Sequence, residues 1–394
     1  MELALNSESL NRAFLRVFPE SGDDAAILEV QAPGRVNLIG EHTDYNDGFV
    51  FPMAIDRVTA IALRRRGDQL IRLYSTAQRQ MAEFSIGGPV KKDPPAWSLY
   101  AKGVCEALRQ KGHTGLGADI LVESDIPLGG GLSSSAAFEV ATALALLSAW
   151  GQTMPPVEMA LACQWAEHHY AGTPCGIMDQ FISAMAKAGH AMLLDCRDQS
   201  YRQIPLDDPT VCVVIVNSHV KHELVAGEYK DRRSQCQAAV AALAKMYPVA
   251  KALRDVTMPM LQEGQPSMDP VVFKRARHVV GENQRALDFA AALQKRDYTA
   301  CGRLMYASHA SLRDDYAVSC PELDTLVDLS RSISGVFGAR LTGGGFGGCV
   351  VVLAKKEAIA PLTQVLEREY PLRCGKNPGI FATAPGPGAH VVRG

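Results

Sequence analysis

A glycine-rich turn that runs directly into a helical pattern is the feature that most restricts how this sequence can fold. Residues 127–137 read Pro-Leu-Gly-Gly-Gly-Leu-Ser-Ser-Ser-Ala-Ala, and the helical pattern continues to Trp150. Glycines allow a backbone to adopt positive φ and to approach a bulky group closely. A helix start also presents unpaired N–H groups and the positive end of its dipole. The segment therefore predicts an anion-binding turn, with an ordinary structural turn as the alternative.

The common phosphate-binding motifs do not describe this turn. A P-loop needs a lysine after its glycines, and none follows here. A dinucleotide fingerprint needs a third glycine where Ser134 stands. The ligand of the turn must therefore be inferred from other segments.

Length and charge exclude several classes of protein. A chain of 394 residues usually forms two domains. A formal net charge of −2 is untypical of a nucleic-acid-binding surface. The longest apolar run, 136–150, contains Glu139 and is shorter than the roughly 20 residues that span a bilayer. Ten scattered cysteines without a C-x-x-C pair favour free thiols. We expect a cytoplasmic protein without nucleic-acid or membrane partners.

Strand and helix signals alternate in the first half of the chain, and long helical patterns dominate the second half. We expect strands at 26–32, 49–63, 69–74, 118–123, 189–195, 211–216, 336–341, 349–354 and 379–383. We expect helices at 98–110, 133–150, 156–171, 177–187, 228–246, 271–295, 297–313, 321–332 and 357–370. The segment 257–270 is rich in Pro, Met and Gln and is expected to be a loop, and the domain boundary is expected between 205 and 225.

A polar segment at 32–48 lies between two strand signals and is expected to be a loop. Glu41, His42, Asp44 and Asn46 place four hydrogen-bonding groups within six positions. Two carboxylates in such a loop suit a polyhydroxylated ligand, because each can accept from two hydroxyl groups. Arg35 is a fixed cation that could face a phosphoryl group. The alternative is a solvated turn.

A second glycine segment, 342–348, matches G-x-G-x-x-G but not its usual contexts. A β-branched strand signal follows it at 349–353, whereas a dinucleotide fingerprint must begin a helix. Too few residues remain for the catalytic part of a protein kinase. The segment predicts a glycine loop between two strands that can press its backbone against a ligand.

Two acidic residues follow the first glycine turn. Asp179 comes after a Gly/Pro turn and begins a helical pattern, so it could cap the helix or act as a base. Glu167 lies on a predicted helix, where an isolated acid is usually solvated.

Taken in order, the glycine and polar segments resemble those of the GHMP small-molecule kinases. Pro127 to Ala136 resembles the nucleotide loop of that family. The string Gly34 to Tyr45, Gly-Arg-Val-Asn-Leu-Ile-Gly-Glu-His-Thr-Asp-Tyr, resembles the narrower signature of the galactokinases. The segments 175–180 and 341–349 are similar to those of galactokinases too. The resemblance extends from about residue 30 to the C-terminus.

The resemblance implies an α+β fold of two domains with the active site between them. The N-terminal domain, 1–210, would resemble ribosomal protein S5 domain 2 and would carry the sugar-binding and phosphate loops. The C-terminal domain, 211–394, would be ferredoxin-like and would carry the glycine loop 343–348. The implied reaction is Mg²⁺-dependent transfer of phosphate from ATP to the anomeric hydroxyl of α-D-galactose. This is the first committed step of galactose catabolism (the Leloir pathway).

The resemblance also implies a role for individual residues. Asp179 would take the proton from the sugar hydroxyl, and Arg35 would hold Asp179 and offset charge on the phosphoryl group. The residues that would bind the sugar are Glu41, His42, Asp44, Gly176, Asp179 and Tyr229. Those that would bind ATP are Gly129, Gly130, Gly131, Leu132, Ser133, Ser134 and Ser135, with Trp97 beside the adenine. Mg²⁺ would be held by Ser135 and Glu167.

Two alternatives stay open. An N-acetylgalactosamine kinase shares most of this pattern. A non-catalytic sensor of galactose and ATP is the other, although such relatives carry damaged nucleotide loops, whereas 133–137 is intact and Asp179 is present. We expect a monomer or a weak oligomer.

Overall fold

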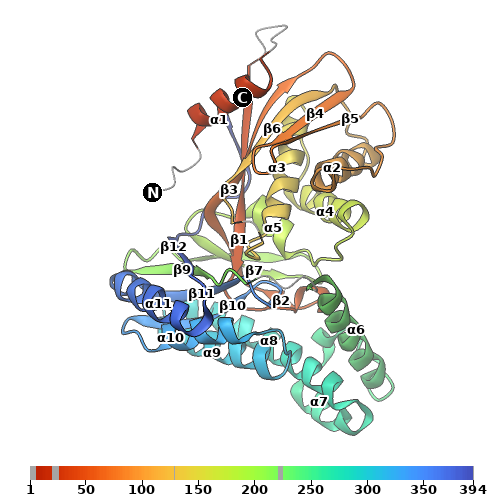
Figure 1. Ribbon diagram of the computed structural model, residues 1–394. Coiled ribbons are helices and arrows are strands. Elements are labelled where there is room, and N and C mark those ends of the chain that lie inside the picture. The colour runs from red at the N-terminus through yellow and green to blue at the C-terminus, as the bar shows by residue number, and fades with distance from the viewer. Residues whose placement is uncertain (1–5, 20–25, 128, 221–224, 394) are drawn as a thin grey trace.

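The computed structural model describes residues 6–19, 26–127, 129–220 and 225–393, which form an upper and a lower part in Figure 1. The larger sheet belongs to the upper part, and its strands come from both the beginning and the end of the chain. In spatial order it contains β13 (His390–Arg393), β1 (Leu28–Asn37), β3 (Pro52–Arg65), β6 (Ala118–Ser124), β4 (Leu70–Ser75) and β5 (Gln80–Ser85). All neighbours are antiparallel except β4 and β6.

Helices cover both faces of this sheet. One face carries α2 (Leu99–Gln110), α3 (Ser134–Ala149), α4 (Pro156–Ala166) and α5 (Met178–Met185), and the other carries α1 (Ser7–Val17). Ile61 and Leu63 of β3 pack into the core on the α3 side, whereas Ala60 and Ala62 pack against Phe14 of α1. Because both faces of this part of β3 are buried, residues 58–63, Val-Thr-Ala-Ile-Ala-Leu, read as a nearly continuous apolar run.

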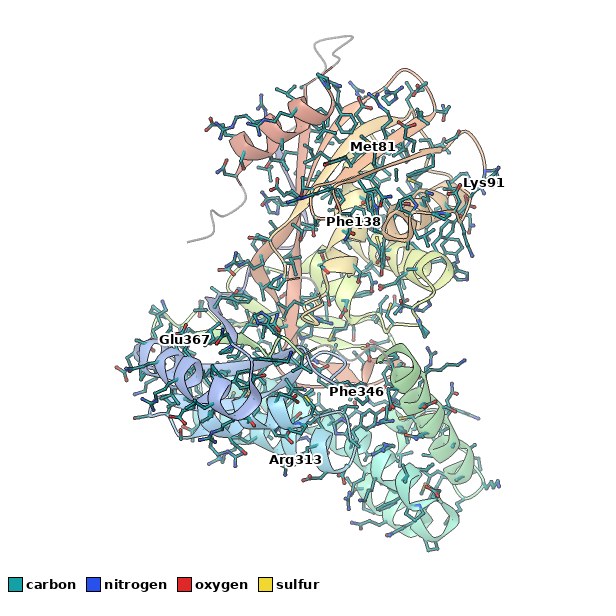
Figure 2. All side chains as sticks on the ribbon, in the orientation of Figure 1. Met81, Lys91, Phe138, Arg313, Phe346 and Glu367 are labelled. Carbon is teal, nitrogen blue, oxygen red and sulfur yellow. The ribbon has the colours of Figure 1, made fainter. Side chains whose placement is uncertain are left out.

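The lower part is built on a four-stranded sheet covered by long helices. Its strand order is β10 (Val336–Thr342), β11 (Cys349–Lys355), β9 (Val211–Asn217) and β12 (Gly379–Thr383). Its helices are α6 (Val225–Leu243), α7 (Met258–Gly264), α8 (Pro270–Gln294), α9 (Tyr298–Asp314), α10 (Pro321–Arg331) and α11 (Ile359–Cys374). Figure 2 shows Phe138, on α3, in the upper part and Phe346, between β10 and β11, in the lower part.

A third, small sheet of β2 (Phe49–Val50), β7 (His190–Asp195) and β8 (Tyr201–Pro205) contacts α8. Alternate residues of β11 join different cores. Val350 and Val352 pack in the core of the lower part, and Val351 and Leu353 pack in a core that also includes Val36 of β1. This shared core joins the two parts through apolar packing.

Most of the expected elements are confirmed, with ends that differ by a few residues. The expectation for 257–270 was wrong, because this segment contains α7 and a 3₁₀ turn at Gln265–Ser267. Its three prolines, Pro259, Pro266 and Pro270, occupy first-turn positions of α7, of the 3₁₀ turn and of the helix that follows, where a missing N–H costs nothing. The expectation that 32–48 is all loop was also wrong at its start, since β1 extends to Asn37 and carries Arg35. Sequence patterns did not reveal α1, β5, β8 or β13.

The ten cysteines are all free, as expected. Among the described residues, no helix combines the length and apolar content that a membrane crossing requires.

Candidate active site

Arg35 and Asp179 form a bidentate ion pair at the end of β1. The Nε and Nη2 atoms of Arg35 each donate to one oxygen of Asp179, and both distances are 2.7 Å. The Nη1 atom of Arg35 donates to the carbonyl of Gly131 at 2.6 Å. Burial alone would lower the pKa of Arg35, but the negative charges of Asp179 and Glu41 outweigh this effect and raise the pKa. Arg35 is therefore a fixed cation that joins Asp179 to the glycine turn.

The glycine turn precedes α3, as predicted. Gly129, Gly131 and Ser133 have φ of 71°, 70° and 60°, a region that suits glycine and strains other residues. The Ser133 hydroxyl donates to Oδ2 of Asp179 at 2.5 Å. Ser134 and Ser135 follow in the first turn of α3 and line a cavity. Leu132 is buried, and its carbonyl accepts from the N–H of Arg35 at 3.0 Å.

The second glycine segment packs against the first one. It connects β10 and β11, which confirms the predicted loop between two strands. A Cβ atom on Gly343 would lie 3.0 Å from the carbonyl oxygen of Gly131, and one on Gly348 would lie 3.1 Å from that of Gly130. The two loops can approach this closely only because side chains are missing from both.

All six residues predicted to bind the sugar line one cavity. Glu41, His42, Asp44, Gly176, Asp179 and Tyr229 surround it together with Arg35, Gly343 and Gly344. His168, Cys175 and Lys230 line the same cavity and were missed. Cys175 lies within one of the segments singled out in the sequence, so a closer reading of that segment could have found it.

The acidic side chains of this cavity are strongly influenced by burial. Burial raises the pKa of Glu41, and Arg340 and Arg35 oppose the rise. Burial, with the charges of Asp179 and Glu41, raises the pKa of Asp44 to about 7. Such a group gains from ligand hydroxyls that hydrogen-bond to its ionised form.

His42 is a neutral, oriented side chain. Burial lowers its pKa to about 3. Its Nε2 atom lies 3.2 Å from the carbonyl oxygen of Gly344, which can only accept, so Nε2 carries the proton. Its Nδ1 atom therefore accepts from the hydroxyl of Tyr45 at 2.7 Å. The φ of His42 is 62°, so the turn holds this residue in a conformation that it rarely adopts.

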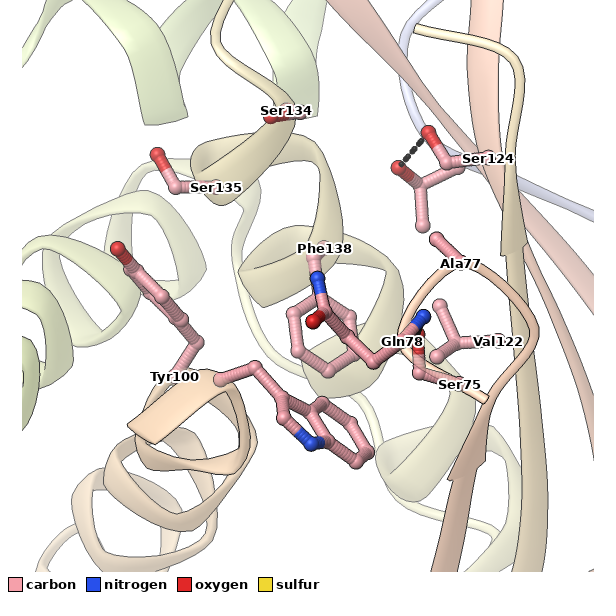
Figure 3. Close-up of a pocket in the computed structure, with 11 residues that line it drawn as sticks. Ser75, Ala77, Gln78, Tyr100, Val122, Ser124, Ser134, Ser135 and Phe138 are labelled. Atoms are coloured by element: carbon pink, nitrogen blue, oxygen red, sulfur yellow. Dashed lines mark hydrogen bonds between the residues drawn. The ribbon is translucent and has the colours of Figure 1, made fainter. Parts of the chain in front are cut away.

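The second cavity is more apolar and begins at the start of α3. Ser134, Ser135 and Phe138 of α3, Tyr100 of α2 and Gln78 surround the same space in Figure 3. Trp97, predicted to lie beside adenine, lines this cavity, with its ring centroid 6.5 Å from that of Phe138. Flat aromatic walls and nearby hydroxyl groups suit a heterocyclic base joined to a polar chain. Tyr100, Phe138 and Gln78 were missed.

Glu167 lies in a buried acidic cluster beside Ser135. It accepts from Gln180 at 2.6 Å and from the thiol of Cys175 at 3.3 Å. Gln180 also donates to Glu139 at 3.1 Å. Burial and the charge of Asp179 raise the pKa of Glu167, while a hydrogen bond with Ser135 lowers it. One oxygen of Glu139 is buried without a partner.

This cluster fits a hard cation. A buried carboxylate and a neighbouring hydroxyl are oxygen ligands of the kind that Mg²⁺ takes, and Mg²⁺ keeps several waters and phosphate oxygens besides. No group of three or more His, Cys, Asp or Glu side chains that could hold a metal occurs within the described ranges. A Mg²⁺ site with two protein ligands, such as Ser135 and Glu167, does not need such a group.

Three family profiles match separate parts of the chain. They are the galactokinase galactose-binding signature at 12–65, the GHMP kinase N-terminal domain at 99–187 and the GHMP kinase C-terminal domain at 289–371. The galactokinase of Roseiflexus sp. (strain RS-1) is 48% identical over 89% of this chain and 90% of its own length. The galactokinase of Homo sapiens is 45% identical over 90% of this chain and 91% of its own length.

Solved structures agree. Lactococcus lactis galactokinase complexed with galactose has a TM-score of 0.93 at 32% identity, covering 97% of this chain and 99% of that one. Methanococcus jannaschii mevalonate kinase, at 20% identity, has a TM-score of 0.65 over 92% of this chain and all of its own, and so shares the fold. The predicted α+β GHMP kinase fold is confirmed. With 48% identity extending over 89% of its residues, the chain belongs to the galactokinase family of the GHMP kinases and is an ATP-dependent sugar kinase.

Proposed function

We propose that this chain transfers the γ-phosphoryl group of Mg²⁺-bound ATP to the anomeric hydroxyl of α-D-galactose, producing galactose 1-phosphate and ADP. The position of Asp179 carries the proposal. Asp179 lines the cavity that contains Glu41 and Asp44, and it also accepts from Ser133, the residue just before α3. A carboxylate in the sugar cavity is thus one hydrogen bond from the phosphate turn.

Asp179 accepts the proton of the attacking hydroxyl, and Arg35 holds its carboxylate in place. Phosphoryl transfer depends mainly on positioning and on the neutralisation of charge. The bidentate bonds at 2.7 Å fix the carboxylate before the sugar arrives. Arg35 also offsets negative charge near the Gly131 carbonyl to which it donates.

The side chains of the first cavity select the sugar. Glu41 and Asp44 accept from its hydroxyl groups, and His42 and Tyr229 add hydrogen bonds and flat surface. Gly176 leaves room for Asp44, since a Cβ atom there would lie 1.7 Å from Oδ2 of Asp44. The related Lactococcus lactis enzyme was solved in complex with galactose, which supports galactose as the sugar here.

The second cavity takes the nucleotide. The adenine lies beside Trp97, and the phosphates lie over the turn formed by 129–135. Ser135 and Glu167 would hold Mg²⁺, which would neutralise phosphate charge when bound. A bound cation would offset the buried negative charge of Glu167 and so reduce its repulsion of the phosphates.

The chain works in the cytoplasm as a monomer or a weak oligomer, with 1–210 and 211–394 as its two domains. Ten free thiols support a reducing compartment. The division is supported by the four-stranded sheet, whose strands all follow residue 210, although β13 returns to pair with β1.

Release of ADP tests the proposal directly. Purified protein with Mg²⁺-bound ATP should release ADP when galactose is added, faster than with N-acetylgalactosamine at the same concentration. Asp179→Asn should lower kcat by about 10²- to 10⁴-fold, the usual contribution of a general base, while galactose still binds. Absence of ADP release from the wild type would favour the sensor alternative. Faster turnover of N-acetylgalactosamine than of galactose would favour an N-acetylgalactosamine kinase.

A further inference from the structure

One buried carboxylate of helix α8 holds the backbone of the turn that carries Glu41 and His42. The Oε1 atom of Glu282 accepts from the N–H of Gly40 at 2.9 Å and from the N–H of Glu41 at 3.3 Å. Glu282 is fully buried and does not line the sugar cavity. Its contacts with the turn span more than 240 residues of sequence.

The same helix also holds the carbonyl side of Glu41. His278, one helical turn before Glu282, lies with Nε2 3.1 Å from the carbonyl oxygen of Glu41. Since that oxygen can only accept, Nε2 is the donor, and Nδ1 accepts from Ser311 at 2.9 Å. The peptide groups on both sides of Glu41 are therefore fixed by α8.

Glu282 is itself held by charged and polar partners. Its Oε1 atom accepts from the hydroxyl of Ser308 at 2.6 Å, and its Oε2 atom accepts from Nε of Arg285 at 2.6 Å. Burial alone would raise its pKa, but the charges of Arg285 and Arg340 and the hydrogen bond from Ser308 reverse this effect, and the pKa is lowered to about 2. The acceptor is thus an ionised carboxylate, which forms stronger hydrogen bonds than a neutral group does.

A second link leads from Glu282 to the Glu41 side chain. Ser308 accepts from Nε of Arg340 at 3.2 Å, and Nη1 of Arg340 lies 3.4 Å from Oε1 of Glu41. Oε1 of Glu41 also accepts from the N–H of Gly343 at 2.7 Å. Backbone and side chain of Glu41 are consequently oriented through one network that includes Glu282.

We infer that Glu282 is a positioning residue for sugar recognition: it presents Glu41 and His42 to the sugar through the backbone of residues 40 and 41. This role rests on the proposed function, in which these two side chains bind galactose. Because the contacts of Glu282 reach the sugar turn and not the cavity around Trp97, its loss weakens sugar binding and leaves nucleotide binding intact.

Glu282→Gln tests this role. An amide offers one acceptor oxygen instead of two, so it cannot serve both the turn and Arg285. We expect KM for galactose to rise about 10-fold or more, with KM for ATP changed less than about two-fold. Hydrogen exchange of the peptide that covers 38–46 should be faster in this variant.

Glu106→Gln is the matched control. Glu106 is also a buried helical glutamate that pairs with an arginine three residues later and accepts a backbone N–H, from Val90 at 3.1 Å. It lies on α2, away from the sugar turn, so its loss should lower the melting temperature and leave KM for galactose unchanged. Ser308→Ala removes one donor to Glu282 with little change of volume, and should raise KM for galactose about three-fold.

An unchanged KM for galactose in Glu282→Gln, or equal rises in both KM values, would overturn the inference. If Glu282→Gln does not fold, the Ser308→Ala variant decides in the same way. A wild-type protein that does not turn over galactose would refute the proposed function by itself. Normal wild-type turnover with an unaffected variant refutes only the role of Glu282.

Discussion

Gly176 lies against the carboxylate of Asp44 so closely that a Cβ atom at position 176 would fall 1.7 Å from Oδ2 of Asp44. No rotation of a methyl group relieves such a contact, so Asp44 or the 172–176 loop must move. We predict that Gly176→Ala raises KM for galactose at least about 10-fold with little change in KM for ATP. Steady-state kinetics with each substrate varied checks this. Gly88→Ala, where no atom lies within 4 Å, should behave as the wild type.

The raised pKa of Asp44 makes stability depend on pH in a definite direction. Asp44 binds its proton more tightly in the folded protein, where burial raises its pKa to about 7 from the ordinary 3.8. The stabilisation that this provides is complete below about pH 4 and is lost as pH rises through about 7. The ligand-free Asp44→Asn variant, which does not titrate, should therefore melt several degrees above the wild type at pH 8 and near it at pH 4.5.

Thermal unfolding of both proteins across this pH range, without sugar, measures the effect. Asp198→Asn is a control of opposite sign, because hydrogen bonds from Ser200 lower the pKa of Asp198. Loss of that carboxylate should cost stability at pH 8. If the melting temperature of Asp44→Asn exceeds that of the wild type by the same amount at pH 4.5 and at pH 8, the pKa of Asp44 is not raised.

The chain's site could be predicted from sequence where its residues fall within short segments, and not where distant residues meet. Arg35 and Asp179 each stood in a recognisable segment, and the resemblance to known kinases supplied their roles. Nothing in the sequence connects Glu282 with Gly40, because a single glutamate on a long amphipathic helix is usually a solvated side chain. Its burial is decided by the packing of α8 against the turn.

The fold shows the same division. Long periodic helices and β-branched strands were predictable because local patterns reflect one buried face or two. The helix α7 was missed because its proline content is typical of loops, although prolines at first-turn positions are compatible with a helix. The strand β13 has exposed side chains throughout and so carries no apolar pattern, and it forms by pairing with the edge of β1.

Loss of the Glu167 carboxylate should change the metal requirement. Burial and the charge of Asp179 raise the pKa of Glu167, so this carboxylate has an unfavourable charge that a cation would offset. We predict that Glu167→Gln needs about 10-fold more Mg²⁺ for half-maximal ADP release, because the loss of one charged ligand weakens metal binding. Titration of Mg²⁺ at fixed ATP measures this. Glu158→Gln, on the exposed side of α4, should match the wild type, and an unaltered Mg²⁺ requirement in Glu167→Gln would exclude Glu167 as a ligand.

Removal of the indole at position 97 should affect the nucleotide and spare the sugar. Trp97 lines the cavity of Ser134 and Ser135, and its Nε1 atom donates to Gln80 at 2.9 Å, which fixes the plane of the ring. Stacking of an aromatic ring on a base contributes about 1–3 kcal/mol, so Trp97→Ala should raise KM for ATP about 5- to 150-fold. KM for galactose should stay within about two-fold, since the sugar cavity does not include Trp97. Trp165→Ala is the matched control, because Trp165 stacks on His169 and lines neither cavity. A variant in which galactose binding weakens as much as ATP binding would show that Trp97 supports the fold of α2 rather than the base.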